Sequence, residues 1–109
     1  MEVITANKLK TLKQKAGITA KQLLDNPDCE IVHLTLQPSG YLKRHSVPFP
    51  VQFYVTKGTA TFLLDDKEYI IQENHVLNCE LKSKHGIKNN TDKKLIVLVI
   101  KHKNKKERS

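Results

Sequence analysis

From Cys29 onward, the chain consists of short β-type segments separated by turn residues, and this alternation limits the possible folds more than any other feature. The segments are rich in β-branched and aromatic residues, and they end at proline, glycine, asparagine or aspartate. Many short strands with closely spaced turns are typical of an all-β antiparallel sandwich or small barrel. The predicted strands are Ile31–Leu36, Val51–Thr56, Thr59–Leu64, Lys67–Gln72, Val76–Leu81 and Leu95–Ile100.

Two of the turns have recognisable chemistry. Asp65 and Asp66 separate two predicted strands, so we expect them at the tip of a β-hairpin. Asn74 lies in a second turn, where asparagine can adopt the left-handed conformation that glycine usually supplies. We expect a loop around His85-Gly86 and a polar turn over 89–94.

The N-terminal part of the chain has a different pattern. Apolar residues recur at helical spacing among lysines between Ile4 and Ala16, which predicts a short amphipathic helix that Gly17 ends. The segment Thr19–Leu24 is expected to add another helical turn, with Thr19 as its N-cap. The predicted fold is therefore all-β with a short N-terminal helical segment.

The net charge of +8 is concentrated at the two ends of the chain. Residues 1–24 carry five lysines and one glutamate, and residues 101–109 carry five basic residues and one glutamate, so each end contributes +4. Residues 25–100 carry nine basic and nine acidic groups. We interpret the basic ends as solvated segments. Nucleic-acid binding through them is the less favoured reading, because no aromatic and basic stacking platform accompanies the charge.

A chain of 109 residues has room for one domain with one hydrophobic core. We expect an N-terminal helical or extension segment (1–28), a β-barrel (29–101) and a basic C-terminal tail (102–109). The two cysteines, Cys29 and Cys79, give no disulfide framework, and the N-terminus lacks the pattern of a secretory signal. The longest apolar run is too short to cross a bilayer. These features lead us to expect a cytoplasmic protein with no membrane association.

The stretch from Gly40 to Gly58 resembles the first motif of the cupin family. That motif runs glycine, a short spacer, His-x-His, then glutamate, and a second glycine after six further residues. In this sequence the first histidine place holds His45. The second histidine place holds Val47, and the glutamate place holds Val51.

The second cupin motif is matched less completely. It ends in histidine, three residues and asparagine, and His85 and Asn89 have that separation here. The Gly-Asp of the family, which precedes this strand, is replaced by Asn74-His75, and its proline by Glu80.

The resemblance covers roughly residues 29–101 and implies a small jelly-roll barrel of the RmlC-like cupin type, which usually forms a homodimer. It also implies that His45 and His85 converge inside the barrel. Family members bind a divalent metal such as iron, manganese, zinc or nickel there, through three histidines and a carboxylate. Valine has no lone pair to donate, so the motif is incomplete, and a catalytic metal normally needs at least three protein ligands.

Two functions follow from this reading, and the first is a binding protein of unknown specificity. In it, His45 and His85 form hydrogen bonds to a small ligand in an otherwise apolar barrel, and Tyr41, Phe49 and Phe53 line the pocket. For these aromatic residues, a place in the ordinary hydrophobic core is the alternative.

The second function is a metal-dependent enzyme of the dioxygenase, isomerase or decarboxylase type. Here His45 and His85 are metal ligands, and His33 or a substrate group completes the coordination. The sequence leaves open whether His33 faces the barrel interior. Glu80, near the interior end of its strand, is a further candidate for the missing ligand.

Overall fold

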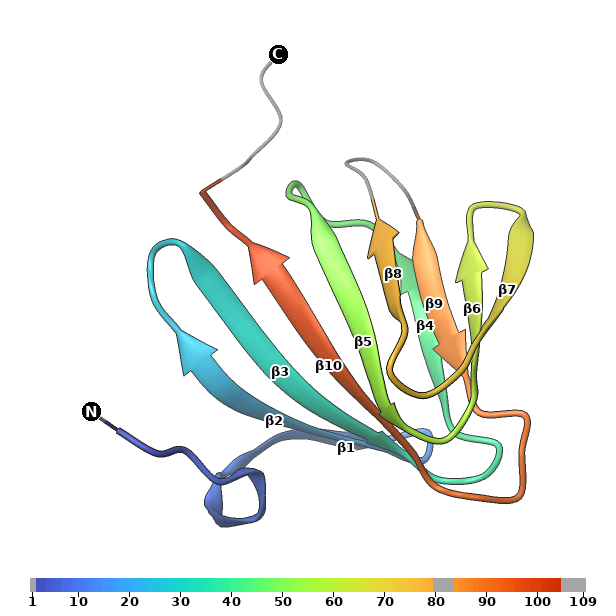
Figure 1. The fold of residues 1–109 in the computed structure, drawn as a ribbon, viewed down its shortest axis with the longest axis horizontal. Coiled ribbons are helices and arrows are strands. Elements are labelled where there is room, and N and C mark those ends of the chain that lie inside the picture. Colours follow the sequence, from blue (N-terminus) through green and yellow to red (C-terminus); the bar gives the residue numbers. More distant parts are fainter. Residues whose placement is uncertain (1, 80–83, 105–109) are drawn as a thin grey trace.

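Strands with alternating inward and outward side chains make up most of the computed structural model, which describes residues 2–79 and 84–104 (Figure 1). The elements of the described residues are the 3-10 turn η1 (Ala6–Lys8) and the strands β1 (Thr11–Lys15), β2 (Ile18–Asp25), β3 (Cys29–Leu36), β4 (Tyr41–His45), β5 (Val51–Lys57), β6 (Ala60–Leu64), β7 (Lys67–Ile71), β8 (Val76–Cys79), β9 (His85–Lys88) and β10 (Leu95–His102).

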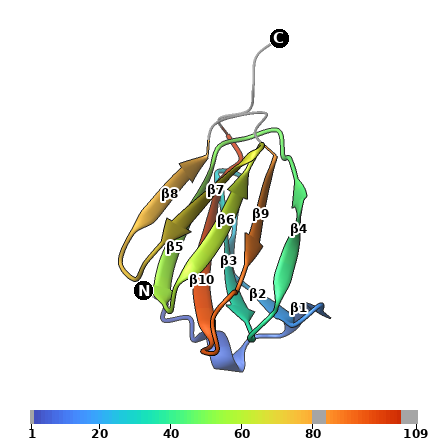
Figure 2. The same cartoon turned by 90° about the vertical axis from the view of Figure 1, so that its right-hand side faces the viewer.

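The strands form two antiparallel sheets. The larger sheet has the order β1-β2-β3-β10-β5-β8, and the smaller sheet has the order β4-β9-β6-β7. Figures 1 and 2 show the two sheets facing each other across a shared interior. The prediction of an all-β antiparallel jelly roll is confirmed.

The core lies between the sheets, and period-two alternation selects its residues. On β10, Leu95, Val97 and Val99 are buried, while the residues between them are half-buried on the outer face. The continuous apolar run Leu95–Ile100 is typical of a strand buried on both faces, whereas the structure buries one face fully. β10 lies in the larger sheet between β3 and β5, and its register pairs Leu95 with Leu36 at the far end of β3.

The predicted N-terminal helix is wrong. Apart from the three-residue turn η1, the described part of this region forms the hairpin β1–β2, which pairs with β3. Ala16 and Gly17 form its two-residue turn, with φ angles of 54° and 75°. Positive φ at both positions is the signature of a type I′ hairpin, which joins strands and does not end a helix. Pairing with β3 buries Ile18 and Ala20 at strand spacing, and this long-range contact overrides the local helical pattern.

The predicted turns at Asp65 and Asn74 are confirmed. Both residues have positive φ, 53° and 65°, and the β6–β7 hairpin pairs Leu64 with Lys67 around its two-residue tip. The expected loop at His85-Gly86 is wrong, because this segment begins β9. β9 pairs with β6 and with β4, a strand that the sequence pattern did not reveal.

Buried Asn89 fixes the end of the barrel where β9 ends. Its side-chain nitrogen donates to the carbonyl oxygens of Leu36 and Lys93, at 3.0 and 2.7 Å. Its side-chain oxygen accepts from the backbone and hydroxyl groups of Thr91. These bonds satisfy a fully buried amide and join β3 to the loop before β10.

In the described residues, no helix is long and apolar enough to span a membrane.

Candidate functional site

A cavity of about 480 Å³ lies at the opposite end of the barrel, where β3, β5 and β9 begin and where β4 and β10 end. Most of its wall is apolar and continues the core. The lining residues are Leu12, Ala20, Glu30, Val32, Leu34, Leu42, Lys43, Arg44, His45, Val47, Val51, Phe53, His85, Val99 and Lys101. Its volume is within the range of roughly 300–1,000 Å³ that is typical of small-molecule sites.

His85 is the buried polar group of this cavity. It is the first residue of β9, and its exposed fraction is 4%. Neither Nδ1 nor Nε2 has a hydrogen-bond partner among residues 2–79 and 84–104. Because buried polar atoms in proteins are almost always paired, two unpartnered nitrogens on a side chain that lines a cavity indicate a place for a ligand or for ordered water.

His45 lies beside His85 at the cavity mouth. It ends β4, opposite His85 in the sheet register, and it is exposed. The two ring centroids are 4.9 Å apart, and the ring planes meet at 67°. His45 Nδ1 lies 3.1 Å from the carbonyl oxygen of Lys43. A carbonyl can only accept, so Nδ1 carries a proton and donates to it.

The environment of His85 keeps it neutral. Burial, with smaller contributions from neighbouring His45 and Lys101, lowers its pKa from the ordinary value of 6.5 to about 4. Phe53 adds to the apolar surroundings, with its ring centroid 5.1 Å from that of His85. At neutral pH the imidazole therefore offers one N–H donor and one nitrogen acceptor.

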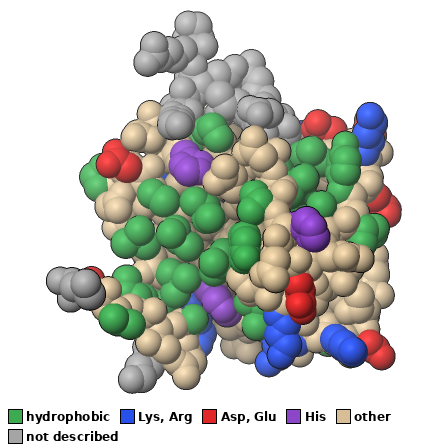
Figure 3. Space-filling view, in the orientation of Figure 1, with side chains coloured by type: hydrophobic (Ala, Val, Ile, Leu, Met, Phe, Trp, Pro, Cys, Tyr) green, Lys and Arg blue, Asp and Glu red, His purple; other side chains and the backbone are tan. Residues whose placement is uncertain are grey.

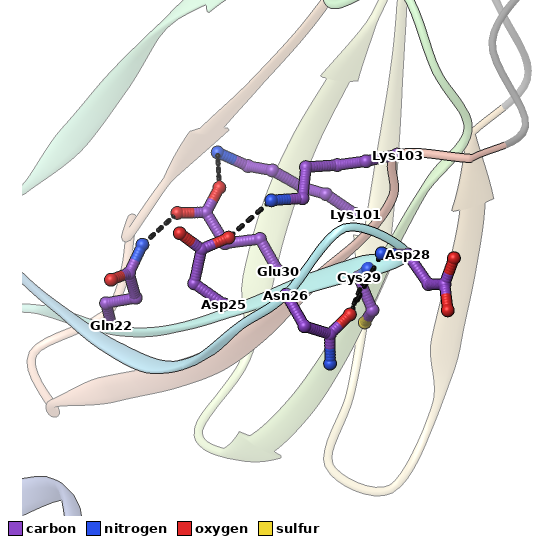
Figure 4. A network of polar contacts seen from close by, with 8 residues as sticks. All are labelled: Gln22, Asp25, Asn26, Asp28, Cys29, Glu30, Lys101 and Lys103. Carbon is purple, nitrogen blue, oxygen red and sulfur yellow. Dashed lines mark hydrogen bonds and ion pairs between the residues drawn. The ribbon is translucent and has the colours of Figure 1, made fainter.

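The wall of the larger sheet contributes a charged pair that sequence reasoning missed (Figure 4). Lys101 and Glu30 are opposite each other in the register of β10 and β3, with Nζ and Oε1 3.2 Å apart. The other carboxylate oxygen of Glu30 accepts from the amide of Gln22. The signal was present in the sequence: Glu30 continues the inward positions of Val32 and Leu34, at a spacing of two.

A second layer of polar contacts holds the strand ends next to this pair. Lys103, the first residue after β10, contacts Asp25 at the end of β2. Asn26 accepts from the backbone N–H groups of Asp28 and Cys29, each at 2.9 Å. Figure 4 shows these contacts around the turn between β2 and β3. These contacts hold the turn between β2 and β3 in place, and they therefore also hold Glu30, which follows it directly.

Of the three aromatic residues predicted to line the pocket, one lines the cavity and two do not. Phe53 lines the cavity and also packs in the core. Phe49 is half-buried against the core and does not line the cavity. Tyr41 is 50% exposed at the start of β4, away from the cavity.

His33 lies on the outer side of the larger sheet. It alternates with buried Val32 and Leu34 and lines a separate depression that includes Lys21. Burial, and then the positive charge of Lys21, lower the pKa of His33. It does not join His45 and His85. Glu80, the other candidate for the missing ligand, lies outside the described residues.

A family model described as the cupin domain matches residues 32–101, which is more than half of the chain. The chain belongs to the cupin family. Comparison with curated proteins gives no match.

Solved structures share the cupin fold at low sequence identity. An RmlC-like cupin from Shewanella frigidimarina has a TM-score of 0.82 and 14% identity, covering 94% of this chain and 91% of that chain. KdgF from Halomonas sp. has a TM-score of 0.78 and 14% identity, covering 94% of both chains. The polyketide cyclase RemF from Streptomyces resistomycificus has a TM-score of 0.82 and 16% identity, covering 96% of this chain and 81% of that chain. At these identities the likeness shows the fold alone.

Cupin domains often bind metals, so the donors in this cavity decide whether a metal fits. The structure places Val47 and Val51 in the cavity wall with His45 and His85. The valines supply no lone pair, and two imidazoles are fewer than the three protein ligands of a typical catalytic site. Within the described ranges 2–79 and 84–104, no group of three histidine, cysteine, aspartate or glutamate side chains is placed to hold a metal ion. The donor set does not fit the metal site that the family motif specifies.

Proposed function

We propose that this cupin binds a small organic molecule in the barrel cavity, with His45 and His85 as its hydrogen-bonding partners. The observation that carries the proposal is His85, a buried imidazole that lines a cavity of about 480 Å³ and whose two nitrogens have no partner among the described residues. Leaving such a group unpaired costs about 1–3 kcal/mol, which a ligand with a matching polar group would offset.

The shape of the cavity indicates what kind of molecule suits it. Among the lining residues, Val32, Leu34 and Val99 are buried and form an apolar floor, whereas the polar residues Lys43, Arg44 and His45 are exposed. A ligand with an apolar body and one polar end would bury its hydrocarbon against this floor. Its polar end would then reach the ring nitrogens of the two histidines.

Two probes with the same apolar body test this proposal: neutral phenylacetamide and charged phenylacetate. We expect at least one of them, at millimolar concentration, to shift the imidazole resonances of His85 and the methyl resonances of Val32 and Val99 in NMR titrations. A Val47→Phe variant, which fills the cavity mouth, should lose these shifts. The matched Val76→Phe variant changes a valine that is 52% exposed outside the cavity, and it should retain them. If neither probe moves the cavity resonances of the wild-type protein, the proposal is wrong.

A metal-dependent enzyme is the alternative, and metal analysis distinguishes it. Proteins with similar folds include a polyketide cyclase, so the fold itself is compatible with catalysis. The alternative predicts a stoichiometric divalent metal, such as iron, manganese, zinc or nickel, in protein purified without a histidine tag. That metal should disappear in the His45→Ala, His85→Ala double variant. Our proposal predicts protein that stays folded with well under one equivalent of metal.

We also propose that the chain works as a homodimer through the outer face of the larger sheet. Figure 3 shows hydrophobic side chains gathered over the middle of this sheet. The outward-facing residues of this sheet include Leu98, which is half-buried on β10, and Val76, which is exposed on β8. Light scattering tests this proposal: Leu98→Glu should give monomers, whereas Tyr69→Glu on the smaller sheet should not. A monomeric wild-type protein would contradict it.

A further inference from the structure

The charges that line the cavity are unequal in number. Lys43, Arg44 and Lys101 contribute three positive charges, whereas Glu30 contributes a single negative charge among the lining residues. His85 adds no charge at neutral pH, because its pKa is lowered to about 4, chiefly by burial. Positive charge next to apolar walls attracts an anion more strongly than it would in open water.

Lys101 is the cation built into the cavity wall. Lys43 and Arg44 are exposed on β4, and the guanidinium of Arg44 donates to the carbonyl oxygen of Asp65. Lys101, by contrast, continues the inward positions of Val99 on β10, and its side chain is 26% exposed. Its charge is also one of the causes of the lowered pKa of His85, so the two groups share one electrostatic environment.

In the Glu30–Lys101 ion pair, the carboxylate has more contacts than the ammonium group does among the described residues. One oxygen of Glu30 contacts Lys101 and the other accepts from Gln22, so both oxygens of the carboxylate are engaged. An ammonium group has three N–H donors, and Glu30 is the partner that the described residues give Lys101. The donors of Lys101 that Glu30 does not take, and the N–H of His85, can each bind an acceptor.

We infer that the ligand of this cavity carries a carboxylate and that Lys101 is the residue that selects it. The inference rests on the proposed function and adds the chemical class of the ligand. A carboxylate accepts only, through two oxygens, which matches the donors of Lys101 and His85. A cationic ligand would meet Lys101 as a like charge, and a neutral ligand would leave the ammonium group with fewer charge-assisted bonds. Glu30 holds the side chain of Lys101 in place, and the remaining ammonium hydrogens of Lys101 bind the ligand.

The test compares three probes that share one aromatic body: phenylacetate, phenylacetamide and phenethylammonium. Dissociation constants come from NMR titration of the full-length protein. We expect phenylacetate to bind about tenfold or more tightly than phenylacetamide, and phenethylammonium to bind most weakly. Lys101→Met keeps most of the side-chain length and removes the charge. It should bring the acid and the amide to within about threefold of each other while the affinity for the amide is retained.

Two further variants make the result specific to Lys101. Lys103→Met removes a lysine two residues further along the chain that also has an acidic partner but lies outside the cavity lining, so it should keep the preference for phenylacetate. Glu30→Gln, combined with Lys101→Met, removes both members of the pair and should behave like Lys101→Met. This double variant excludes an effect of the uncompensated Glu30 charge.

The outcomes separate this inference from the proposed function. Equal affinity of the wild-type protein for acid and amide would overturn the inference and leave the cavity as a binding site. A preference for the acid that survives in Lys101→Met would also overturn it. Failure of all three probes to shift the cavity resonances would contradict the proposed function itself.

Discussion

His85 packs against Phe53 with ring centroids 5.1 Å apart and ring planes at 70° to each other. Phe53 in turn packs against Phe62 in the core, at 5.0 Å. The imidazole therefore has hydrocarbon on one side and the cavity on the other, and its protonation state depends on both.

This arrangement makes folding stability depend on pH in the acidic range. The pKa of His85 is about 4 in the folded protein and near its ordinary value of 6.5 in the unfolded chain. Between these values the unfolded chain binds a proton that the folded protein does not. The free energy of unfolding should therefore fall as pH decreases from 6.5 toward 4, by up to about 3 kcal/mol. Above pH 6.5 the group is neutral in both states and contributes no pH dependence.

Urea denaturation near neutral pH and near the lower end of this window checks the prediction. His85→Gln removes the titrating group, so the stability of this variant should fall less between the two pH values than that of the wild-type protein. Equal losses of stability in the wild-type protein and this variant would contradict the prediction.

Restoring donors at the two valine positions should create a metal site. Val47 and Val51 both line the cavity with His45 and His85, so Val47→His combined with Val51→Glu supplies the missing imidazole and carboxylate. We expect about one equivalent of Zn²⁺ or Ni²⁺ per chain in the double variant, measured by calorimetry, and much weaker binding in the wild-type protein.

Stability provides an independent readout for the same variant. Val51 is 1% exposed, so a glutamate there should destabilise the metal-free protein, and added metal should raise the melting temperature again. Tight metal binding by the wild-type protein would show that donors other than these two positions complete the site.

Two substitutions at the β1–β2 turn should change the stability of the protein in opposite directions. Gly17 has a φ of 75°, and an added Cβ would lie 2.8 Å from the Cα of Gly40. Gly17→Ala should therefore destabilise the protein by about 1–2 kcal/mol or more. Ala16→Gly, at a φ of 54°, should be neutral or stabilising by up to about 1 kcal/mol. A helix over this segment would give the reverse order, since glycine costs about 1 kcal/mol relative to alanine within a helix.

Removal of the Asn89 side chain should be among the most damaging polar changes. Asn89→Ala deletes the donors to the carbonyl oxygens of Leu36 and Lys93 at a fully buried position. We expect a loss of about 2–4 kcal/mol in chemical denaturation. Asn90→Ala is the matched control. Asn90 is exposed and donates to the hydroxyl of Thr61, so a loss below about 1 kcal/mol is expected.

The sequence predicts much of this fold because hairpin chemistry is local. Asp65 and Asn74 fix turns through their own backbone conformations, and β6 and β7 need little else to find their register. The N-terminal hairpin was missed because Ile18 and Ala20 are buried by pairing with β3, a contact that no local pattern encodes. A helical repeat among lysines was the stronger local signal.

The two histidines of the site could be predicted because their signal is also local in the sequence. His45 and His85 are found by motif spacing, and the structure places them side by side. Glu30 and Lys101 have no motif, and they face the cavity because β3 and β10 pair in one particular register. Tyr41 illustrates the opposite error, since an aromatic residue close to a motif is half exposed outside the cavity.

The place of β10 in the larger sheet has a consequence for synthesis on the ribosome. β3 and β5 are translated well before β10, yet they lie on either side of it and do not pair with each other. Leu95 pairs with Leu36, from which it is separated by most of the domain. The edges of β3 and β5 that pair with β10 therefore stay unpaired in the nascent chain until residues 95–102 have left the exit tunnel. Such long-range closure folds slowly, and we expect this interval to be when the protein depends most on chaperones.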